Sequence, residues 1–237
     1  MTGRYRKVAV ITGGSQGIGA GLVAAYRGRG WPVVANAVSI KPSEDPGVLT
    51  VEGDLADPST ADLIISQTLD NFGRVDTLVN NAGVFISKPF TDYTADNYAL
   101  MVGVNLTGFF WMTQRTIPEM LKKPSGHIVN VSATVADVAN SSEPAVLAAL
   151  TKGGLASATR SLAIEYASRG IRVNAVSPAN IQTPIHPPES YEALAKMIPL
   201  GRVGQISDVV NAVMFLESSP YVTGETVHID GGQIAGH

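Results

Sequence analysis

Side chains that could move a proton are concentrated in one stretch of the chain, residues 127–152, whose sequence is HIVNVSATVADVANSSEPAVLAALTK. An apolar strand is expected over His127–Val131, a polar loop follows it, and a helix from about Pro144 to Ser168 carries a lysine. General acid–base chemistry uses amines, carboxylates and hydroxyls held within reach of one substrate. The candidates here are Lys152, Asp137, Glu143, Ser132, Thr134, Ser141 and Ser142.

A glycine-rich turn near the N-terminus has the residues needed to cradle a phosphate. The apolar run Lys7–Ile11 predicts a buried strand, and it leads directly into TGGSQGIG, Thr12–Gly19, where a helix begins. Gly13 permits a tight turn, Gly17 lets a pyrophosphate approach the backbone, and Gly19 allows close helix packing. The alternative is an ordinary glycine-rich turn, because the spacing G-x-x-x-G-x-G departs from the general dinucleotide fingerprint.

Short apolar runs alternate with helical patterns along the whole chain. This rhythm predicts βαβ units, and therefore a parallel sheet covered on both faces. We expect an α/β fold, a single doubly wound Rossmann-type domain over residues 1–237 with about seven parallel strands and helices on both faces. The expected strands are Lys7–Ile11, Trp31–Ala37, Val48–Glu52, Asp76–Val79, His127–Val131, Arg172–Val176 and Glu225–Ile229. Helices are expected after Ile18, after Asp57, from about Ala95 to Met120, from about Pro144 to Ser168, and from Ser207.

The segment of about residues 180–204 interrupts this rhythm with four prolines. A doubly wound sheet binds its ligand at the carboxyl ends of its strands, and this segment follows one of those ends. We expect it to form a substrate lid, from which His186 and Tyr191 could reach the substrate.

The overall composition narrows the classes of partner. Of the 237 residues, 45% are hydrophobic and 16% charged, and the net charge of −3 disfavours nucleic acid or an anionic membrane. No apolar run reaches the roughly 20 residues of a membrane span. The absence of cysteine excludes disulfides and Cys-ligated metals; we expect no metal site and a cytoplasmic location.

The order of these motifs resembles the short-chain dehydrogenase/reductase family over almost the whole chain. Thr12–Gly19 resembles its TGxxxGxG, Asn80–Gly83 its NNAG, and Pro178–Thr183 (PANIQT) its PGxxxT, with Ala179 in place of glycine. Val222–Gly232 resembles the family's C-terminal strand and tail. The resemblance implies a small-molecule substrate and a homodimer or homotetramer built through the helix that carries the lysine and through the C-terminal segment.

The same resemblance implies a set of cofactor-binding residues. The pair Asp54-Leu55 would lie against the adenine, Lys152 would bind the ribose, and residues 178–183 would receive the nicotinamide amide. Asn105 falls where the family's helix asparagine stands. The implied set is Gly13, Ser15, Gln16, Gly17, Ile18, Gly19, Val38, Ser39, Asp54, Leu55, Asn81, Ala82, Gly83, Lys152, Pro178, Ala179, Ile181 and Thr183.

The choice between NAD and NADP depends on the end of the second strand. NAD specificity usually needs an acid there to bind the ribose 2′-hydroxyl, and the sequence around Val38 has no carboxylate before Glu44. NADP would favour a cation against its phosphate, which is also missing at Gln16 and Val38. Ser15, Ser39 and Lys41 could contact a 2′-phosphate, although Lys41 is equally well read as a solvated lysine. We therefore favour NADP over NAD.

The residues at the expected catalytic positions differ from those of the family. Its active-site tyrosine stands four residues before the lysine, where both side chains share a helix face, and this chain has Ala148 there. The family's substrate-binding serine in VNxSS corresponds to Ala133. The interval between these positions is about two residues longer than usual. Methyl groups thus replace both side chains that would contact the substrate oxygen.

Three interpretations remain open. The first is an NAD(P)-dependent oxidoreductase, working in the reductase direction, that transfers hydride to a C=N or C=O bond with a non-standard proton source. Imines fit better than ketones, because an iminium ion accepts hydride without a strong acid. The second is a cofactor-binding homologue without turnover, and the third is an engineered variant of a carbonyl reductase. For the first, the catalytic candidates are Asn105, Lys152, Ser132, Asp137 and Glu143, and the substrate-contact candidates are Ala133, Thr134, Ala148, His186 and Tyr191.

Overall fold

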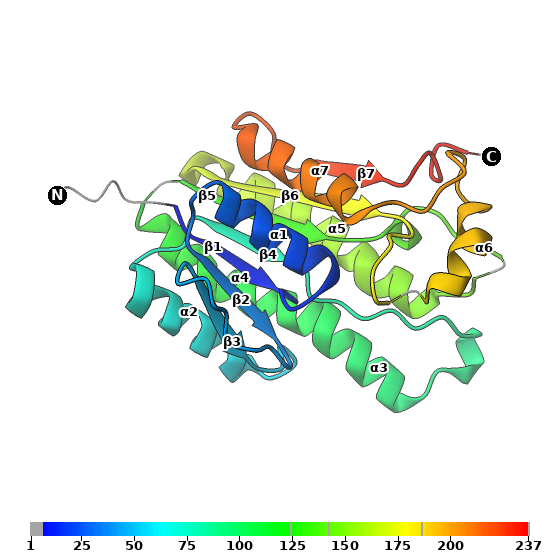
Figure 1. Cartoon of the computed structure of the whole chain (residues 1–237), viewed down its shortest axis with the longest axis horizontal. Helices are drawn as coiled ribbons and strands as arrows, with labels where there is room; N and C mark the ends of the chain where they lie inside the picture. The colour runs from blue at the N-terminus through cyan, green and yellow to red at the C-terminus, as the bar shows by residue number, and fades with distance from the viewer. Residues whose placement is uncertain (1–6, 124, 142, 186, 237) are drawn as a thin grey trace.

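One parallel sheet organises the chain, as seen in a computed structural model that describes residues 7–123, 125–141, 143–185 and 187–236. Its seven strands stand in the order β3-β2-β1-β4-β5-β6-β7, with helices on both faces (Figure 1). The strands are β1 (Ala9–Thr12), β2 (Val33–Ala37), β3 (Val48–Glu52), β4 (Thr77–Asn80), β5 (Gly126–Val131), β6 (Ile171–Pro178) and β7 (Thr226–Ile229). The strand order reverses between β1 and β4, where a doubly wound sheet opens a crevice for its ligand. The predicted fold is confirmed.

The helices follow the strands in the expected rhythm. They are α1 (Gly17–Gly28), α2 (Pro58–Phe72), α3 (Ala95–Val102), α4 (Gly108–Leu121), α5 (Val146–Tyr166), α6 (Tyr191–Ala195) and α7 (Ile206–Ser218). α2 begins where the sequence predicts, because the side chain of Asp57 accepts a hydrogen bond from the backbone N–H of Ser59 at 2.8 Å. It ends at Gly73, whose positive φ of 72° suits glycine.

Two large apolar cores hold five of the helices to the sheet. One joins the strands to α2, α4 and α5 through residues such as Val10, Ile64 and Met112. The other joins them to α1 and α7 through residues such as Ile11 and Leu22. Successive strand residues point to opposite faces, so a strand buried on both faces needs a continuous apolar run.

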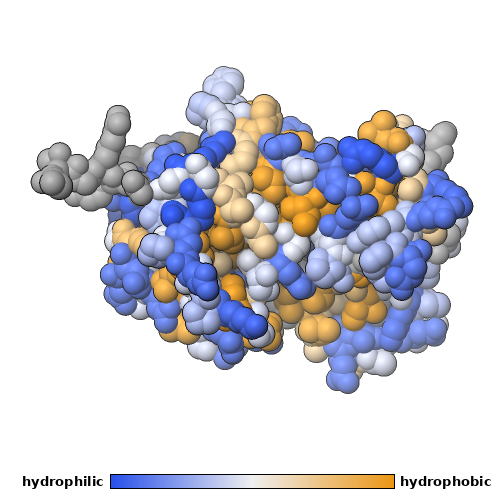
Figure 2. All heavy atoms as spheres, viewed as in Figure 1, coloured by the Kyte–Doolittle hydropathy of each residue, from blue (hydrophilic) through white to orange (hydrophobic). Residues whose placement is uncertain are grey.

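Apolar side chains also reach the surface in patches, one of them in the middle of the face shown in Figure 2. No helix in the described ranges is both long enough and apolar enough to cross a bilayer.

The long helix expected from Ala95 to Met120 is interrupted, and this expectation is corrected. Gly103–Thr107 forms a π-helical turn between α3 and α4. The glycines at its ends pack closely on the loop after β3: a Cβ on Gly108 would lie 2.8 Å from Cβ of Leu55. The π turn directs Asn105 inward, where its Nδ2 donates to the carbonyl oxygen of Val84 at 3.0 Å. Such turns often mark functional sites.

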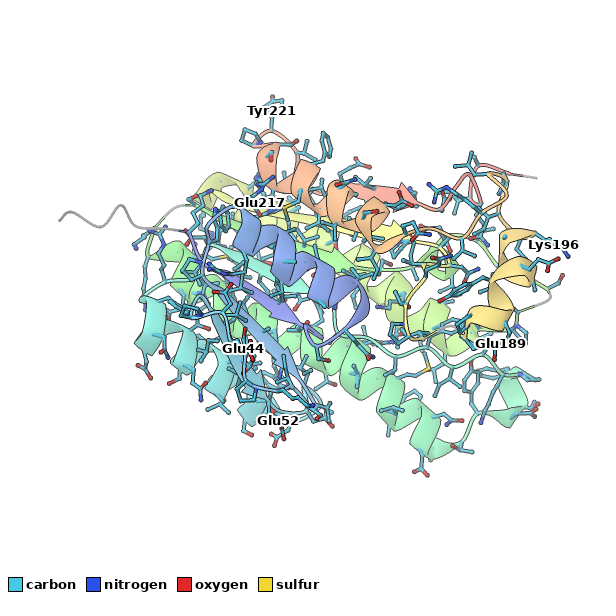
Figure 3. The ribbon with its side chains drawn as sticks, in the orientation of Figure 1. Glu44, Glu52, Glu189, Lys196, Glu217 and Tyr221 are labelled. Carbon is cyan, nitrogen blue, oxygen red and sulfur yellow. The ribbon has the colours of Figure 1, made fainter. Side chains whose placement is uncertain are left out.

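A buried polar cluster closes the edge of the sheet opposite to the cofactor motifs. Glu217, at the end of α7, accepts hydrogen bonds from Tyr26 at 3.1 Å, Thr77 at 2.9 Å and His127 Nδ1 at 2.9 Å. Figure 3 shows Glu217 where α7 meets α1. Asn174 Nδ2 lies 3.2 Å from His127 Nε2, which must therefore accept, so His127 is the neutral Nδ1–H tautomer. We call these five residues the Glu217 cluster.

Candidate active site

The glycine turn between β1 and α1 has the shape of a phosphate cradle. Gly13 and Gly17 have positive φ values of 64° and 56°, a conformation that favours glycine. A Cβ on Gly19 would lie only 1.9 Å from the carbonyl oxygen of Gly13. Gln16 caps α1 without a side-chain hydrogen bond, so the N–H groups of the first turn have no side-chain cap. These features fit a dinucleotide pyrophosphate.

The turn is held to the end of β4 by a reciprocal clasp. Asn81 Nδ2 donates to the carbonyl oxygens of Thr12 and Gly13 at 2.9 and 3.1 Å. In return, Thr12 Oγ1 accepts from the backbone N–H groups of Asn81 and Ala82, both at 3.0 Å. Two motifs almost 70 residues apart are thereby fixed on either side of the crevice at the switch point.

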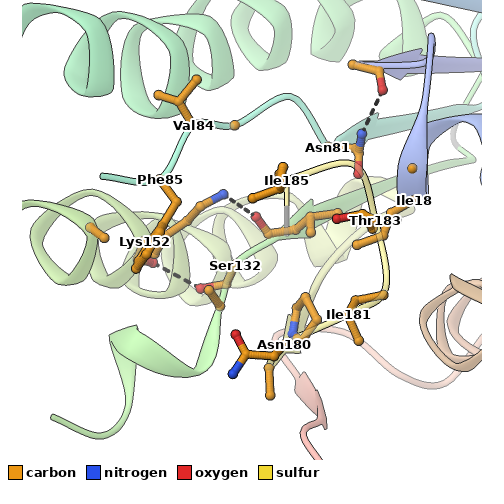
Figure 4. Close-up of a pocket in the computed structure, with 18 of the residues that line it drawn as sticks. Ile18, Asn81, Val84, Phe85, Ser132, Lys152, Asn180, Ile181, Thr183 and Ile185 are labelled. Carbon is orange, nitrogen blue, oxygen red and sulfur yellow. Dashed lines mark hydrogen bonds between the residues drawn. The ribbon is translucent and has the colours of Figure 1, made fainter. Parts of the chain in front are cut away.

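Lys152 is the cation at the centre of the site. It extends from α5 and donates from Nζ to the carbonyl oxygen of Val131 at 2.8 Å. Gly83 gives it room, because a Cβ there would lie 2.9 Å from Nζ. Burial lowers the pKa of Lys152 to about 8. Figure 4 shows Lys152 and Phe85 on one side of the cleft, with Asn81 and Thr183 toward its other end.

Small and already paired side chains line the wall where the substrate oxygen would be bound. Ala133 and Ala148 both line the cleft and present methyl groups to it. The hydroxyl of Ser132 donates to the carbonyl oxygen of Lys152 at 3.2 Å. Thr134 donates to Oε1 of Gln233 at 3.3 Å. Among the described residues, the wall therefore has neither a phenol nor an unpaired serine hydroxyl beside Lys152.

The remaining catalytic candidates lie in different places. Glu143 lines the cleft, whereas Asp137 does not. The short 3-10 turn after β5 directs Asp137 toward β6 and β7, where it accepts from Ser177 at 3.0 Å and lies 3.4 Å from Nε2 of His228. Asn105 lies behind the wall and donates to Thr151 at 3.1 Å. Tyr191 starts α6 away from the cleft, and His186 lies outside the described residues.

The cofactor candidates divide into two groups. Most of them line the cleft: Gly13, Ser15, Gln16, Gly17, Ile18, Gly19, Asn81, Ala82, Gly83, Lys152, Pro178, Ala179, Ile181 and Thr183. Val38, Ser39, Asp54 and Leu55 do not, but they follow β2 and β3 at the same carboxyl edge. Leu55 is buried, and Val38 is 66% exposed. The four therefore lie where the adenosine half of an extended dinucleotide would run.

The two ends of the predicted lid segment, residues 180–204, lie side by side at the edge of the sheet. Gly204 N–H donates to the carbonyl oxygen of Asn180 at 2.9 Å, and Gln182 N–H donates to that of Gly204 at 2.8 Å. The start of the segment contributes to the cleft through Asn180, Ile181, Thr183, Pro184 and Ile185.

Several cleft residues had no signal in the sequence motifs. Val84 and Phe85 follow the NNAG motif, and Val135 follows the loop hydroxyls. Their apolar character was compatible with any core position. Gln233 comes from the tail after β7 and contacts the loop after β5 almost 100 residues away, which no local pattern predicts.

Comparison with known proteins identifies the family. A family model described as enoyl-(acyl carrier protein) reductase matches residues 13–233. The chain belongs to the short-chain dehydrogenase/reductase (SDR) family. This SDR chain is 34% identical to a 3-oxoacyl-[acyl-carrier-protein] reductase of Synechocystis sp., over 99% of both proteins.

Solved SDR structures are similar over nearly the full length. ElxO with NADP bound has a TM-score of 0.91 and 26% identity, covering 98% of this chain and 100% of that chain. The 3-ketoacyl-(acyl-carrier-protein) reductase from Brucella melitensis complexed with NADH has a TM-score of 0.90 and 30% identity, covering 96% and 98%. The chain is thus an NAD(P)-dependent SDR oxidoreductase.

Proposed function

We propose that this SDR chain reduces a C=N bond, in an imine or iminium ion, in preference to a ketone. The observation that carries the proposal is the pair of methyl groups, Ala133 and Ala148, on the cleft wall beside Lys152. Ketone reduction needs a proton donor at the oxygen, and the described residues of this wall offer neither the phenol nor the serine hydroxyl that would supply it. An iminium ion already carries its positive charge, so a hydride alone completes the reduction to a neutral amine.

The residues of the chain would share the work as follows. When bound, the nicotinamide supplies the hydride. The glycine turn would hold the pyrophosphate, Lys152 the ribose, and residues 178–183 the nicotinamide amide. Glu143 lines the same cleft, and its carboxylate would stabilise a cationic substrate. The apolar side chains of Val84 and Phe85 would keep water from the reacting carbon.

A turnover assay with matched substrates tests the proposal. Nicotinamide absorbance is followed with a five-membered cyclic imine and with the corresponding cyclic ketone. We expect imine turnover to exceed ketone turnover by at least about tenfold, and Glu143→Gln to slow the imine reaction about tenfold, as for loss of a charge-assisted contact. Glu189→Gln, at an exposed lid position outside the cleft, is the matched control.

Two results would contradict this function. Faster turnover of the ketone than of the imine would return the chain to carbonyl reduction, the reaction named for its relatives. Tight cofactor binding without oxidation by any imine or ketone would instead support a catalytically silent SDR homologue, an alternative that the intact cofactor end and the missing proton donor also favour.

We propose NADP as the preferred cofactor. The end of β2 has no carboxylate to bind a ribose 2′-hydroxyl, and Val38 and Ser39 are exposed there. The amide of Asn36 is occupied, because it donates to the carbonyl oxygens of Val51 and Gly53, both at 3.1 Å. We expect the Kd of NADPH, measured by fluorescence titration, to be several-fold below that of NADH. A lower Kd for NADH would reverse the preference.

We further propose that the chain is a homodimer or homotetramer, assembled through α5 and the C-terminal segment, as expected from the sequence, and also through α4. Exposed apolar side chains follow both helices, and such surfaces usually mark contacts with other chains. Phe110 of α4 is 51% exposed, and Leu150 and Ile164 of α5 are 59% and 81% exposed. A monomeric mass by light scattering would contradict the assembly.

A further inference from the structure

Gln233 brings an unused hydrogen-bond donor to the substrate side of the cleft. Its Oε1 accepts from the hydroxyl of Thr134 at 3.3 Å, and both residues line the cleft. This contact orients the carboxamide, with the oxygen toward Thr134 and the nitrogen away from it. Within the described residues, no acceptor is bonded to Nε2, which carries two N–H donors.

The position of Gln233 is set by a built turn. Asp230 is buried, and its carboxylate accepts from the backbone N–H groups of Gly232 at 3.0 Å and Ile234 at 2.8 Å. Gly231 and Gly232 have positive φ values of 61° and 94°, which this sharp turn requires. The N–H of Gln233 also donates to the carbonyl oxygen of Asp230 at 3.3 Å. Hydrogen bonds to Asp230 therefore fix the backbone of the C-terminal tail on both sides of Gln233.

The same turn is packed against the end of the lid segment. The N–H of Leu200 donates to the carbonyl oxygen of Gly231 at 3.1 Å. A Cβ on Gly231 would lie 2.5 Å from Cγ2 of Ile198, so the side chain of Ile198 packs directly on the backbone of Gly231. Gln233 is thereby supported from both sides, by the lid and by the loop after β5.

We propose that Gln233 anchors the substrate by donating from Nε2 to a neutral acceptor oxygen, such as an ester or amide carbonyl, beside the bond that is reduced. Ala133 and Ala148 offer the substrate no hydrogen bond, and the hydroxyl of Thr134 is committed to Gln233. A free carboxylate would be a poor ligand, because the Glu143 carboxylate lines the same cleft and Lys152, the cation there, would be bound to the ribose. The inference rests on the proposed reductase function and names the substrate class for it.

Three cyclic imines that share one ring test the anchor: the unsubstituted imine, its neighbouring ethyl ester, and its free carboxylate. A single hydrogen bond of about 1 to 1.5 kcal/mol corresponds to about a 5- to 12-fold effect. We expect the wild-type chain to show a kcat/KM for the ester above that for the unsubstituted imine by this factor, and the carboxylate to be the poorest substrate.

The variant Gln233→Met keeps the length of the side chain but removes the donor. We expect it to abolish the preference for the ester, because KM for the ester should rise more than KM for the unsubstituted imine. Thr134→Val, which removes the group that orients the carboxamide, should lower the same preference in part. Gln67→Met, on α2 and outside the cleft, is the matched control.

The outcomes separate the anchor from the function on which it rests. An unchanged ester preference in Gln233→Met, with the wild-type chain active, would overturn the anchor alone. A wild-type chain that reduces none of the three imines would overturn the proposed function and the anchor together. If Gln233→Met fails to fold, by its thermal unfolding, an unchanged preference in Thr134→Val overturns the anchor.

Discussion

Replacing Ala133 with serine and Ala148 with tyrosine is expected to raise the rate of ketone reduction at least about 100-fold, the lower end of what a general acid contributes. Both positions line the cleft that contains Lys152. Position 148 lies one helical turn before Lys152, so a phenol there would share its helix face. The nearby ammonium would lower the pKa of that phenol and ease proton donation. The measurement is consumption of NADPH with a ketone.

The controls for this double variant separate chemistry from packing. Ala148 is buried beside Met101 and Leu147, so an aromatic ring must find space among apolar neighbours. Ala148→Phe adds the same ring without the hydroxyl and should leave ketone reduction at the wild-type level. Cofactor binding and thermal unfolding report whether each variant folds. No gain in a folded double variant that binds NADPH would contradict this prediction.

Replacing Glu217 with leucine is expected to lower the free energy of unfolding by at least about 3 kcal/mol, because three buried donors lose their acceptor at about 1–3 kcal/mol each. The side chain of Glu217 is 3% exposed, so water cannot readily take its place. Glu217→Gln keeps one acceptor oxygen and should cost less. Urea unfolding of the three proteins measures the difference. Equal stability of Glu217→Leu and the wild-type chain would show that the cluster makes no net contribution.

The Glu217 cluster also gives stability a defined dependence on pH. Burial lowers the pKa of His127, which favours its neutral form. Burial alone would raise the pKa of Glu217, but the hydrogen bond from His127, the positive charge that His127 carries when protonated, and the hydrogen bonds from Thr77 and Tyr26 lower the pKa to about 2. Both folded pKa values therefore lie below their unfolded values, about 6.5 and 4.3.

The direction in which stability changes with pH depends on whether the folded or the unfolded chain binds more protons. Below about pH 6.5 the unfolded chain takes up a proton at His127 that the folded chain resists, so stability falls. Between about pH 4.3 and pH 2 the same holds for Glu217. We expect the urea midpoint to decrease from pH 7 to pH 5 and again toward pH 3. In Glu217→Leu the second decrease should be smaller.

The strands were predictable from sequence because a buried parallel strand must be apolar throughout. β3 begins and ends at the predicted residues, and β5 differs by one residue at its start. The π-helical turn at Gly103–Thr107 was not predictable, because apolar periodicity continues across it. Gly108, at the end of this turn, packs on Leu55, and a contact between residues so distant in sequence has no local pattern.

In the site, too, residues that belong to local sequence motifs could be predicted, and residues placed by contacts with distant parts of the chain could not. The glycine turn, Asn81 and Lys152 could be predicted because each motif directly follows a strand or shares a helix face. Asp137 was proposed as an acid of the lengthened loop after β5, but the 3-10 turn in that loop directs it toward His228. Gln233 could not be predicted, because its place depends on how the tail folds back after β7.

The bridge between Ile181 and Gly204 has a consequence for how substrate range can change. Because Ile181 and Gly204 pair with each other, the lid segment between them is a closed loop with both ends fixed at the sheet edge. Lengthening such a loop is inexpensive: a doubling costs about 0.6 kcal/mol in closure entropy. The lid can therefore be exchanged as a module during evolution or by design, while the glycine turn and Lys152 keep their positions.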